Sequence, residues 1–323
     1  MMTVLSTYPH SRAERDKWIV GLRGQKSYVD ASRPYAFFVE DERARYGEIV
    51  PVATILLTNR ECPWRCLMCD LWKNTLPETV PAGAIPGQID YALKMLPAAR
   101  QVKLYNSGSF FDVRAIPTDD YAAIAERVAH FERVIVESHP SLVAANCFRF
   151  SDLVRGRLEV AMGLETANPE VLARLNKGMT LEQFALAARA LCYHEIDLRV
   201  FVLVKPPFLN EDEALIWAKR SIDFAFDCGA SAVSLIPTRG GNGALEKFAA
   251  TGEFSPPSLE TLEAAAEYGL SLNRGRVFAD VWDLSKLHLC SACSDVRRAR
   301  LQTMNLSQVM VPRARCEDCG AYR

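Results

Sequence analysis

Residues 51–70 read PVATILLTNRECPWRCLMCD, an apolar run followed at once by three cysteines in the spacing C-x3-C-x2-C. The run at 51–59 is short, rich in β-branched residues and almost continuously apolar, which predicts a strand buried on both faces. Cys62, Cys66 and Cys69 therefore follow the carboxyl end of that strand. In a barrel of parallel strands, this is the end where the chemistry takes place.

Five further runs of the same kind follow, separated by helical patterns. The expected strands are 101–107, 133–138, 158–166, 197–204 and 231–237, and the expected helices are 88–98, 119–131, 142–152, 169–175, 181–194 and 211–228. Strands and helices that alternate at this spacing predict a parallel sheet with right-handed crossovers. Six units favour an α/β fold built on a partial (β/α)6 TIM-type barrel, with a doubly wound open sheet as the alternative.

The chain divides into three expected parts. Residues 1–50 form an N-terminal extension, residues 51–250 form the barrel, and residues 251–323 hold a helix and a small cysteine-bearing module. Thr251-Gly252 and the prolines that follow mark the last boundary.

The three clustered cysteines predict an iron–sulfur site. Thiolates suit iron, and three of them on one loop can each bind one iron of a [4Fe-4S] cluster, which leaves the fourth iron open to another ligand. A zinc site is the first alternative, but it needs a fourth ligand from elsewhere. A redox-active thiol pair is the second, and the third cysteine makes it redundant. We predict Cys62, Cys66 and Cys69 as cluster ligands and catalytic residues.

Later strands also end in polar or glycine-containing segments. The third expected strand ends at Glu137, whose carboxylate can accept hydrogen bonds from a ribose or an amine. Arg239 follows the sixth and can pair with a carboxylate in bidentate fashion. A glycine-containing stretch follows the second strand, where the backbone can approach a small ligand closely: Asn106, Ser107, Gly108 and Ser109. Each segment is also compatible with an ordinary turn or an exposed polar strand end.

The cysteine spacing, taken with these strand ends, resembles the radical SAM (S-adenosylmethionine) superfamily. The resemblance implies a [4Fe-4S] cluster and SAM as cofactors, with Met68 beside the adenine and residues 106–109 at the methionyl amine. The segment GLETANPE (163–170), followed by NKG (176–178), implies that Glu165 accepts hydrogen bonds from the ribose hydroxyls. Lys205 opens the segment KPPF, which matches a loop that closes near the adenine in relatives.

A second cysteine group lies near the C-terminus. Two C-x2-C pairs separated by 22 residues predict a zinc-ribbon-like site with four thiolates, from Cys290, Cys293, Cys316 and Cys319. An auxiliary iron–sulfur cluster is the alternative. Residues 286–323 carry seven cations against three carboxylates. This local charge of +4 suits either contact with RNA phosphates or an ordinary solvated surface.

Longer segments resemble the radical SAM subunit of archaeosine synthase over most of residues 33–320. They are TILLTNRECPWRC, VKLYNSGSFFD, VESHP, EVAMGLETANPEVLARLNKG and LVKPPFLNEDEA. The resemblance implies that a 5′-deoxyadenosyl radical acts on a lysine-bearing 7-deazaguanine base in tRNA, and that carbon–nitrogen cleavage leaves a formamidine. It further implies a partner protein that attaches the lysine. Reduction of the cluster calls for an electron donor such as a flavodoxin or ferredoxin.

Composition limits the other possibilities. The 323 residues carry a net charge of −1, which gives no general attraction to nucleic acid. No apolar run reaches the roughly 20 residues of a membrane span, and no export signal precedes the first charges, so we expect a cytoplasmic protein. Two other functions stay open: a radical SAM enzyme that acts on a small molecule or peptide, and a non-catalytic zinc-ribbon subunit that binds RNA.

Overall fold

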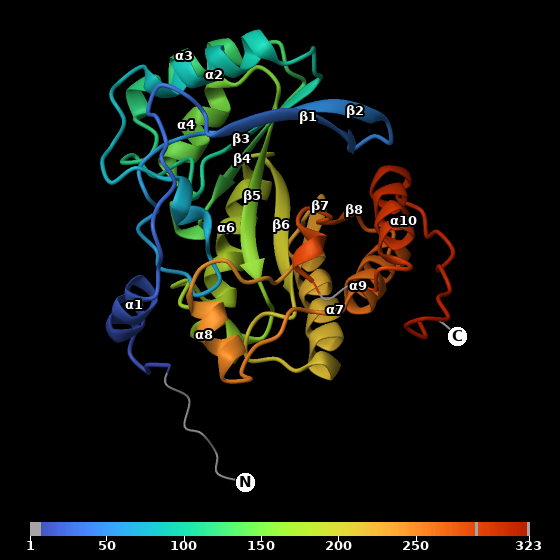
Figure 1. The fold of residues 1–323 in the computed structure, drawn as a ribbon. Helices are drawn as coiled ribbons and strands as arrows, with labels where there is room; N and C mark the ends of the chain where they lie inside the picture. The colour runs from blue at the N-terminus through green and yellow to red at the C-terminus, as the bar shows by residue number, and fades with distance from the viewer. Residues whose placement is uncertain (1–7, 288–289, 322–323) are drawn as a thin grey trace.

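The computed structural model describes residues 8–287 and 290–321 as an α/β fold around one curled sheet (Figure 1). In this part of the chain the sheet has eight strands in the order β1 to β8. Strands β2 to β8 run parallel, whereas β1 pairs with β2 in the antiparallel direction. The strands are β1 (Ala36–Arg43), β2 (Ile49–Leu56), β3 (Gln101–Tyr105), β4 (Arg133–Ser138), β5 (Arg157–Glu165), β6 (Asp197–Val204), β7 (Ala232–Pro237) and β8 (Arg276–Ala279).

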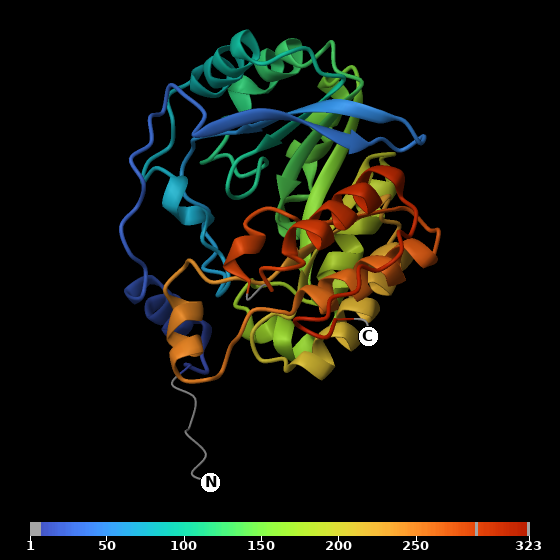
Figure 2. The ribbon, with the colours of Figure 1, turned by 45° about the vertical axis from the view of Figure 1, so that its right-hand side comes forward.

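Helices follow the parallel strands and cover the outer face of the sheet (Figures 1 and 2). These covering helices are α2 (Ala84–Met95), α3 (Tyr121–Arg127), α4 (Ala145–Leu153), α5 (Pro169–Arg174), α6 (Leu181–Tyr193), α7 (Glu211–Asp227) and α9 (Leu259–Ser271). The main core includes Phe110, Phe150 and Val200, which are fully buried. The six predicted parallel strands and the partial-barrel fold class are confirmed.

Further elements were not predicted. They are α1 (Arg12–Gly21), β1, α8 (Ala244–Ala250), β8 and α10 (Ser294–Ser307). Strand β1 does not show the apolar pattern of a buried strand, because its second half reads EDER. Strand β8 escapes it because it is only four residues long. Both edge strands of the sheet thus come from outside residues 51–250.

The charged residues of β1 enter a buried ion network inside the barrel. Glu42 pairs with Lys103 on β3 at 2.6 Å and with Arg199 on β6 at 2.5 Å. Arg199 also contacts Glu159 on β5 at 2.6 Å. Burial alone would raise the pKa of Glu159, but Arg199 and two other arginines lower it to about 2. Each buried charge therefore has a partner, as the desolvation cost requires.

Helix α10 covers the open edge of β8 and also contacts β1. The Asn305 amide exchanges two hydrogen bonds of 2.8 Å with the backbone of Ala279. The Gln308 amide does the same with Val277, at 2.7 and 2.9 Å. Two side-chain amides thus take the place of a ninth strand and satisfy the edge of the sheet.

Candidate functional site

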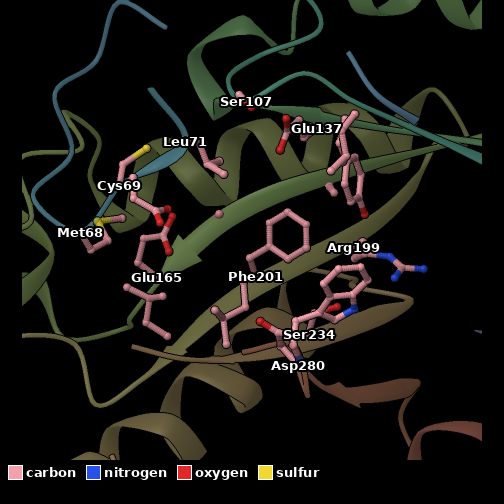
Figure 3. A pocket seen from close by; sticks show the side chains of 18 of the residues that line it. Met68, Cys69, Leu71, Ser107, Glu137, Glu165, Arg199, Phe201, Ser234 and Asp280 are labelled. Atoms are coloured by element: carbon pink, nitrogen blue, oxygen red, sulfur yellow. The ribbon is translucent and has the colours of Figure 1, made fainter. Parts of the chain in front are cut away.

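A cavity of about 720 Å³ extends from the carboxyl ends of the strands into the barrel (Figure 3). Its wall includes Cys62, Cys66 and Cys69 together with Glu165 and side chains from β6, β7 and β8. The three cysteines are thus brought to the same space as the polar strand ends. Met68, Ser107, Gly108, Ser109 and Glu137 also line it.

The cysteine loop is fastened to its neighbours by backbone-directed hydrogen bonds. The Leu67 N–H donates to Leu175 O at 2.9 Å, and the Asn242 amide donates to Leu67 O at 2.6 Å. The amide of Asn176 donates to Arg65 O at 2.8 Å. The NKG segment that begins at Asn176 therefore holds the loop in place as well as ending a helix.

Burial raises the pKa of the Cys62, Cys66 and Cys69 thiols to about 12 each. The protein alone therefore keeps these thiols neutral, and a bound cation is needed to make them thiolates at neutral pH. Gly108 lies directly against this loop, since a Cβ placed there would come within 3.2 Å of Cys62 Cβ. A larger residue at this position would crowd the cysteine loop.

Glu137 supports the glycine-containing turn. Its Oε1 accepts from the backbone N–H of Asn106 at 2.6 Å and of Gly108 at 3.3 Å. Burial raises the pKa of Glu137, although these backbone donors oppose the shift. Asn106 itself is buried behind the turn, and neither polar atom of its side chain has a hydrogen-bond partner among the described residues.

The remaining positions of this turn make local contacts. The hydroxyls of Ser107 and Tyr35 lie 3.0 Å apart, and Ser109 Oγ accepts from the His139 N–H at 2.7 Å. Ser107 adopts a left-handed backbone with φ of 55°. The His139 ring stacks on Trp64 of the cysteine loop, with centroids 3.9 Å apart and planes at 11°. Burial lowers the pKa of His139 to about 3, so its ring is neutral.

Glu165 stands at the end of β5 in a left-handed conformation with φ of 67°. Lys177 Nζ donates to Glu165 Oε1 at 2.5 Å. Burial alone would lower the pKa of Lys177, but Glu165 and the nearby cysteines raise it, so the lysine stays charged. A Cβ on Gly163 would collide with both members of this pair. Sequence reasoning identified Glu165 but missed Lys177 as its partner.

Lys205 is placed apart from the other predicted cofactor-binding residues. Its ammonium group donates to Glu211 at 2.6 Å and to Ser255 Oγ at 2.8 Å. These contacts join the turn after β6 to the segment before α9. Lys205 is therefore not among the side chains that line the cavity.

The far side of the cavity contains residues that sequence reasoning missed. Asp280, the first residue after β8, lines the cavity with Trp282. Arg239, which the sequence suggested could pair with a carboxylate, donates to Asp280 Oδ2 at 3.0 Å and to Trp282 O at 3.1 Å. The signal was present, because DVWD follows the short apolar run RVFA as other polar segments follow their strands.

The four C-terminal cysteines come together as predicted. Their Sγ atoms all lie within 4.8 Å of one another, with Cys290 and Cys316 at 4.0 Å and Cys293 and Cys319 at 3.8 Å. Hydrogen bonds from backbone N–H groups lower the pKa of Cys316 to about 7, which favours a thiolate. The segment between the two pairs is helix α10 rather than the strands of a ribbon.

The basic tail is less available to RNA than its charge suggests. Arg297 and Arg300 are buried and pair with Glu263 at 2.6 and 3.2 Å. Arg300 and Arg313 both pair with Glu267. These ion pairs fasten α10 and the following segment to α9. These three arginines are therefore engaged in ion pairs within the protein, and Arg323 lies outside the described residues.

Sequence comparison identifies archaeal relatives. The chain is 26% identical to an uncharacterised protein of Methanocaldococcus jannaschii, over 91% of this chain and 87% of the relative. It is 28% identical to the archaeosine synthase subunit beta of Methanosarcina acetivorans, over 79% and 78%. The corresponding subunit of Thermococcus kodakarensis is 33% identical over 38% of this chain and 39% of its own length. No protein-family profile matches the sequence.

Solved structures share the fold. Elp3 of Methanocaldococcus infernus matches with a TM-score of 0.52 and 15% identity, over 83% of this chain and 65% of that chain. Methylornithine synthase matches with a TM-score of 0.52 and 13% identity, over 82% and 75%. These matches show a shared fold. The relatives named archaeosine synthase subunit beta confirm the predicted resemblance to that subunit. Among the described helices, none combines the length and apolar character needed to cross a bilayer.

Proposed function

We propose that this chain is a radical SAM enzyme that uses a [4Fe-4S] cluster held by Cys62, Cys66 and Cys69. The observation that carries the proposal is one cavity that joins three cysteine thiols to the polar ends of β3, β4 and β5. When bound, the cluster supplies the electron that divides SAM into methionine and a 5′-deoxyadenosyl radical, which takes hydrogen from a substrate.

The three thiols fit such a cluster better than a single ion. In the described part of the chain, the C-terminal cysteines form the one group whose ligand atoms all lie within 4.8 Å. The sulfur atoms of Cys62, Cys66 and Cys69 do not all lie within that distance of one another, which is compatible with ligands of three different irons. The backbone contacts to Leu67 and Arg65 hold the loop that carries them.

The strand ends supply groups that suit the parts of SAM. Glu137 and the turn at Gly108 stand beside Cys62 and offer carboxylate and backbone groups to an amino acid moiety. Glu165 offers carboxylate oxygens to two ribose hydroxyls, and Lys177 fixes its orientation. The Trp64–His139 stack packs the loop against the segment that follows β4.

The similarity to archaeosine synthase subunit beta supports a tRNA base as the substrate. On this proposal the radical acts on a lysine-bearing 7-deazaguanine, and carbon–nitrogen cleavage leaves the formamidine. The word subunit in the relatives' name supports a partner protein. Such a partner can supply the RNA contacts that the buried arginines of the tail do not.

We further propose zinc for the four C-terminal cysteines. A tetrahedral zinc with bonds of about 2.3 Å places its sulfur ligands about 3.8 Å apart. The observed separations of 3.8 and 4.0 Å match that spacing, whereas ligands of an iron–sulfur cluster would lie farther apart. On this proposal the zinc joins Cys290 and Cys293, which precede α10, to Cys316 and Cys319, which follow it.

Anaerobic reconstitution tests the main proposal. The wild-type chain is expected to bind about four irons at the first site and, once reduced, to release 5′-deoxyadenosine from SAM. Cys66→Ala should lose both the cluster and the product. Cys192→Ala, a substitution of an exposed cysteine outside the cavity, is the matched control and should retain both.

Failure of the reconstituted wild-type chain to cleave SAM would refute the proposal. Addition of unmodified and lysine-bearing tRNA then tests the substrate, with base cleavage expected only for the latter. Turnover of a free small molecule without RNA would contradict the tRNA assignment while leaving the SAM chemistry intact.

A further inference from the structure

The cavity has a second half that the SAM-binding groups do not occupy. Cys69 and Met68 lie at one end of it, Asp280 and Ser234 lie at the other, and Phe201 stands between them (Figure 3). The second half is formed by β6, β7 and β8 with the loop after β8. A substrate in this half would face SAM across Phe201.

We propose that this half binds the substrate base as a flat cation, with Trp282 stacked on the ring and Asp280 accepting hydrogen bonds from its charged nitrogen substituent. This inference rests on the proposed function, because it concerns the substrate of the same site.

The Asp280 carboxylate can accept more hydrogen bonds than its protein partners donate to it. Its Oδ1 accepts a hydrogen bond from the backbone N–H of Trp282 at 2.9 Å, and its Oδ2 accepts one from Arg239 at 3.0 Å. Its side chain keeps 20% of its surface accessible in the cavity wall. Burial raises the pKa of Asp280 even with these donors present, so a further charged donor would stabilise the carboxylate.

Trp282 offers a stacking surface on the same loop. The residue is 52% exposed, although it is a large apolar residue in the cavity wall. Phe38 on β1 supports it, with ring centroids 4.8 Å apart. A ring held in this way can stack with a base at little cost in side-chain entropy.

The charges of this half favour a cation. Its three cations are already engaged: Lys103 with Glu40 and Glu42, Arg199 with Glu42 and Glu159, and Arg239 with Asp280. Because each of these three cations already pairs with a carboxylate, this half is poorly suited to phosphate and better suited to an amine or amidine.

Thr238 is an independent sign of a missing ligand. It lies at the end of β7 in the cavity wall and is 2% exposed. Its Oγ1 has no hydrogen-bond partner among the described residues. Buried hydroxyls are ordinarily satisfied, so a ligand or water in the cavity is expected to complete this one.

Calorimetric binding to the reconstituted chain with SAM tests the inference. The probes are 7-aminomethyl-7-deazaguanine, a cation, and 7-cyano-7-deazaguanine, a neutral base with the same ring. We expect the wild-type chain to bind the cation at least about tenfold more tightly, the ratio that 1.4 kcal/mol gives. Asp280→Asn should remove that preference, and Trp282→Leu should weaken both probes by about tenfold.

Asp152→Asn, an exposed aspartate on α4 outside the cavity wall, is the matched control and should behave as wild type. Zinc content and circular dichroism check that each variant is folded. The asparagine in Asp280→Asn can still accept a hydrogen bond from the backbone N–H of Trp282. Equal binding of the two probes, no binding of either, or an unchanged preference in Asp280→Asn would overturn the inference.

Wild-type SAM cleavage, measured in parallel, separates the two proposals. Cleavage without selective binding of the cation refutes only the base site. Selective binding without cleavage refutes the radical SAM function and leaves the site as a base-binding pocket.

Discussion

Replacing Asn305 with leucine is expected to release the edge of β8 from α10. The leucine has a similar volume but cannot make the two 2.8 Å hydrogen bonds to the Ala279 backbone. Ala279 is 3% exposed, so water does not readily replace the lost partners. At about 1 kcal/mol for each net hydrogen bond, the local opening free energy at this edge should fall by about 2 kcal/mol.

Native-state hydrogen exchange measures this change directly. A loss of about 2 kcal/mol corresponds to roughly 30-fold faster exchange of the Ala279 amide when that amide exchanges by local opening. The Val277 amide should change less, because it donates to Gln308 instead. Gln302→Leu, an exposed amide on the same helix, is the matched control and should leave both amides within about twofold of wild type.

The result that would refute the reasoning is an Ala279 amide that exchanges equally in Asn305→Leu and Gln302→Leu. The side-chain amides would then contribute nothing to the edge. The docking of α10 would then rest on its ion pairs with α9 and on the buried side chains of Leu301 and Met304.

Three other perturbations test the site and its supports. Gly163→Ala should displace the Lys177 ion pair and weaken SAM binding by at least about tenfold; unchanged SAM affinity in equilibrium dialysis would contradict the packing argument. Cys293→Ser should remove the zinc but keep the iron, as metal analysis can show, and loss of both metals would indicate that the two sites fold as one. Hydrogen bonds from Lys205 and two hydroxyl-bearing residues lower the pKa of Glu211 to about 2 against the opposing effect of burial. Because the folded-state pKa is depressed, the stabilisation is present above about pH 4.5 and is lost as the pH falls towards 2. In Glu211→Gln the urea-unfolding midpoint should depend less on pH across that range. A pH dependence equal to that of wild type would count against the Lys205–Glu211 pair.

The apolar strands of the barrel could be predicted because burial on both faces leaves a continuous signal. The run at 133–138 and the strand Arg133–Ser138 agree residue for residue. Strand β1 could not be predicted in this way, because Glu40 and Glu42 point into a network whose cations come from distant strands. Pairing across such distances leaves no local pattern in the sequence.

In the candidate site too, the features set by local sequence could be predicted, and those set by distant contacts could not. Spacing alone brought Cys62, Cys66 and Cys69 together, since their loop is local. Lys205 illustrates the limit, because the side chain at a strand end can point either way and here meets Glu211. Asp280 could have been found by applying the strand-end rule once more, but the four-residue strand before it was too short to be noticed.

The position of α10 has a consequence for synthesis of the chain. The cysteine loop at 62–69 leaves the ribosome more than two hundred residues before Asn305 and Gln308. Strand β8 is made only shortly before α10, and until α10 docks its edge lacks the amide cover and can pair with another chain. The same interval leaves the side of the barrel between β1 and β8 uncovered by α10. This side of the barrel is therefore the last to be closed as the chain is made.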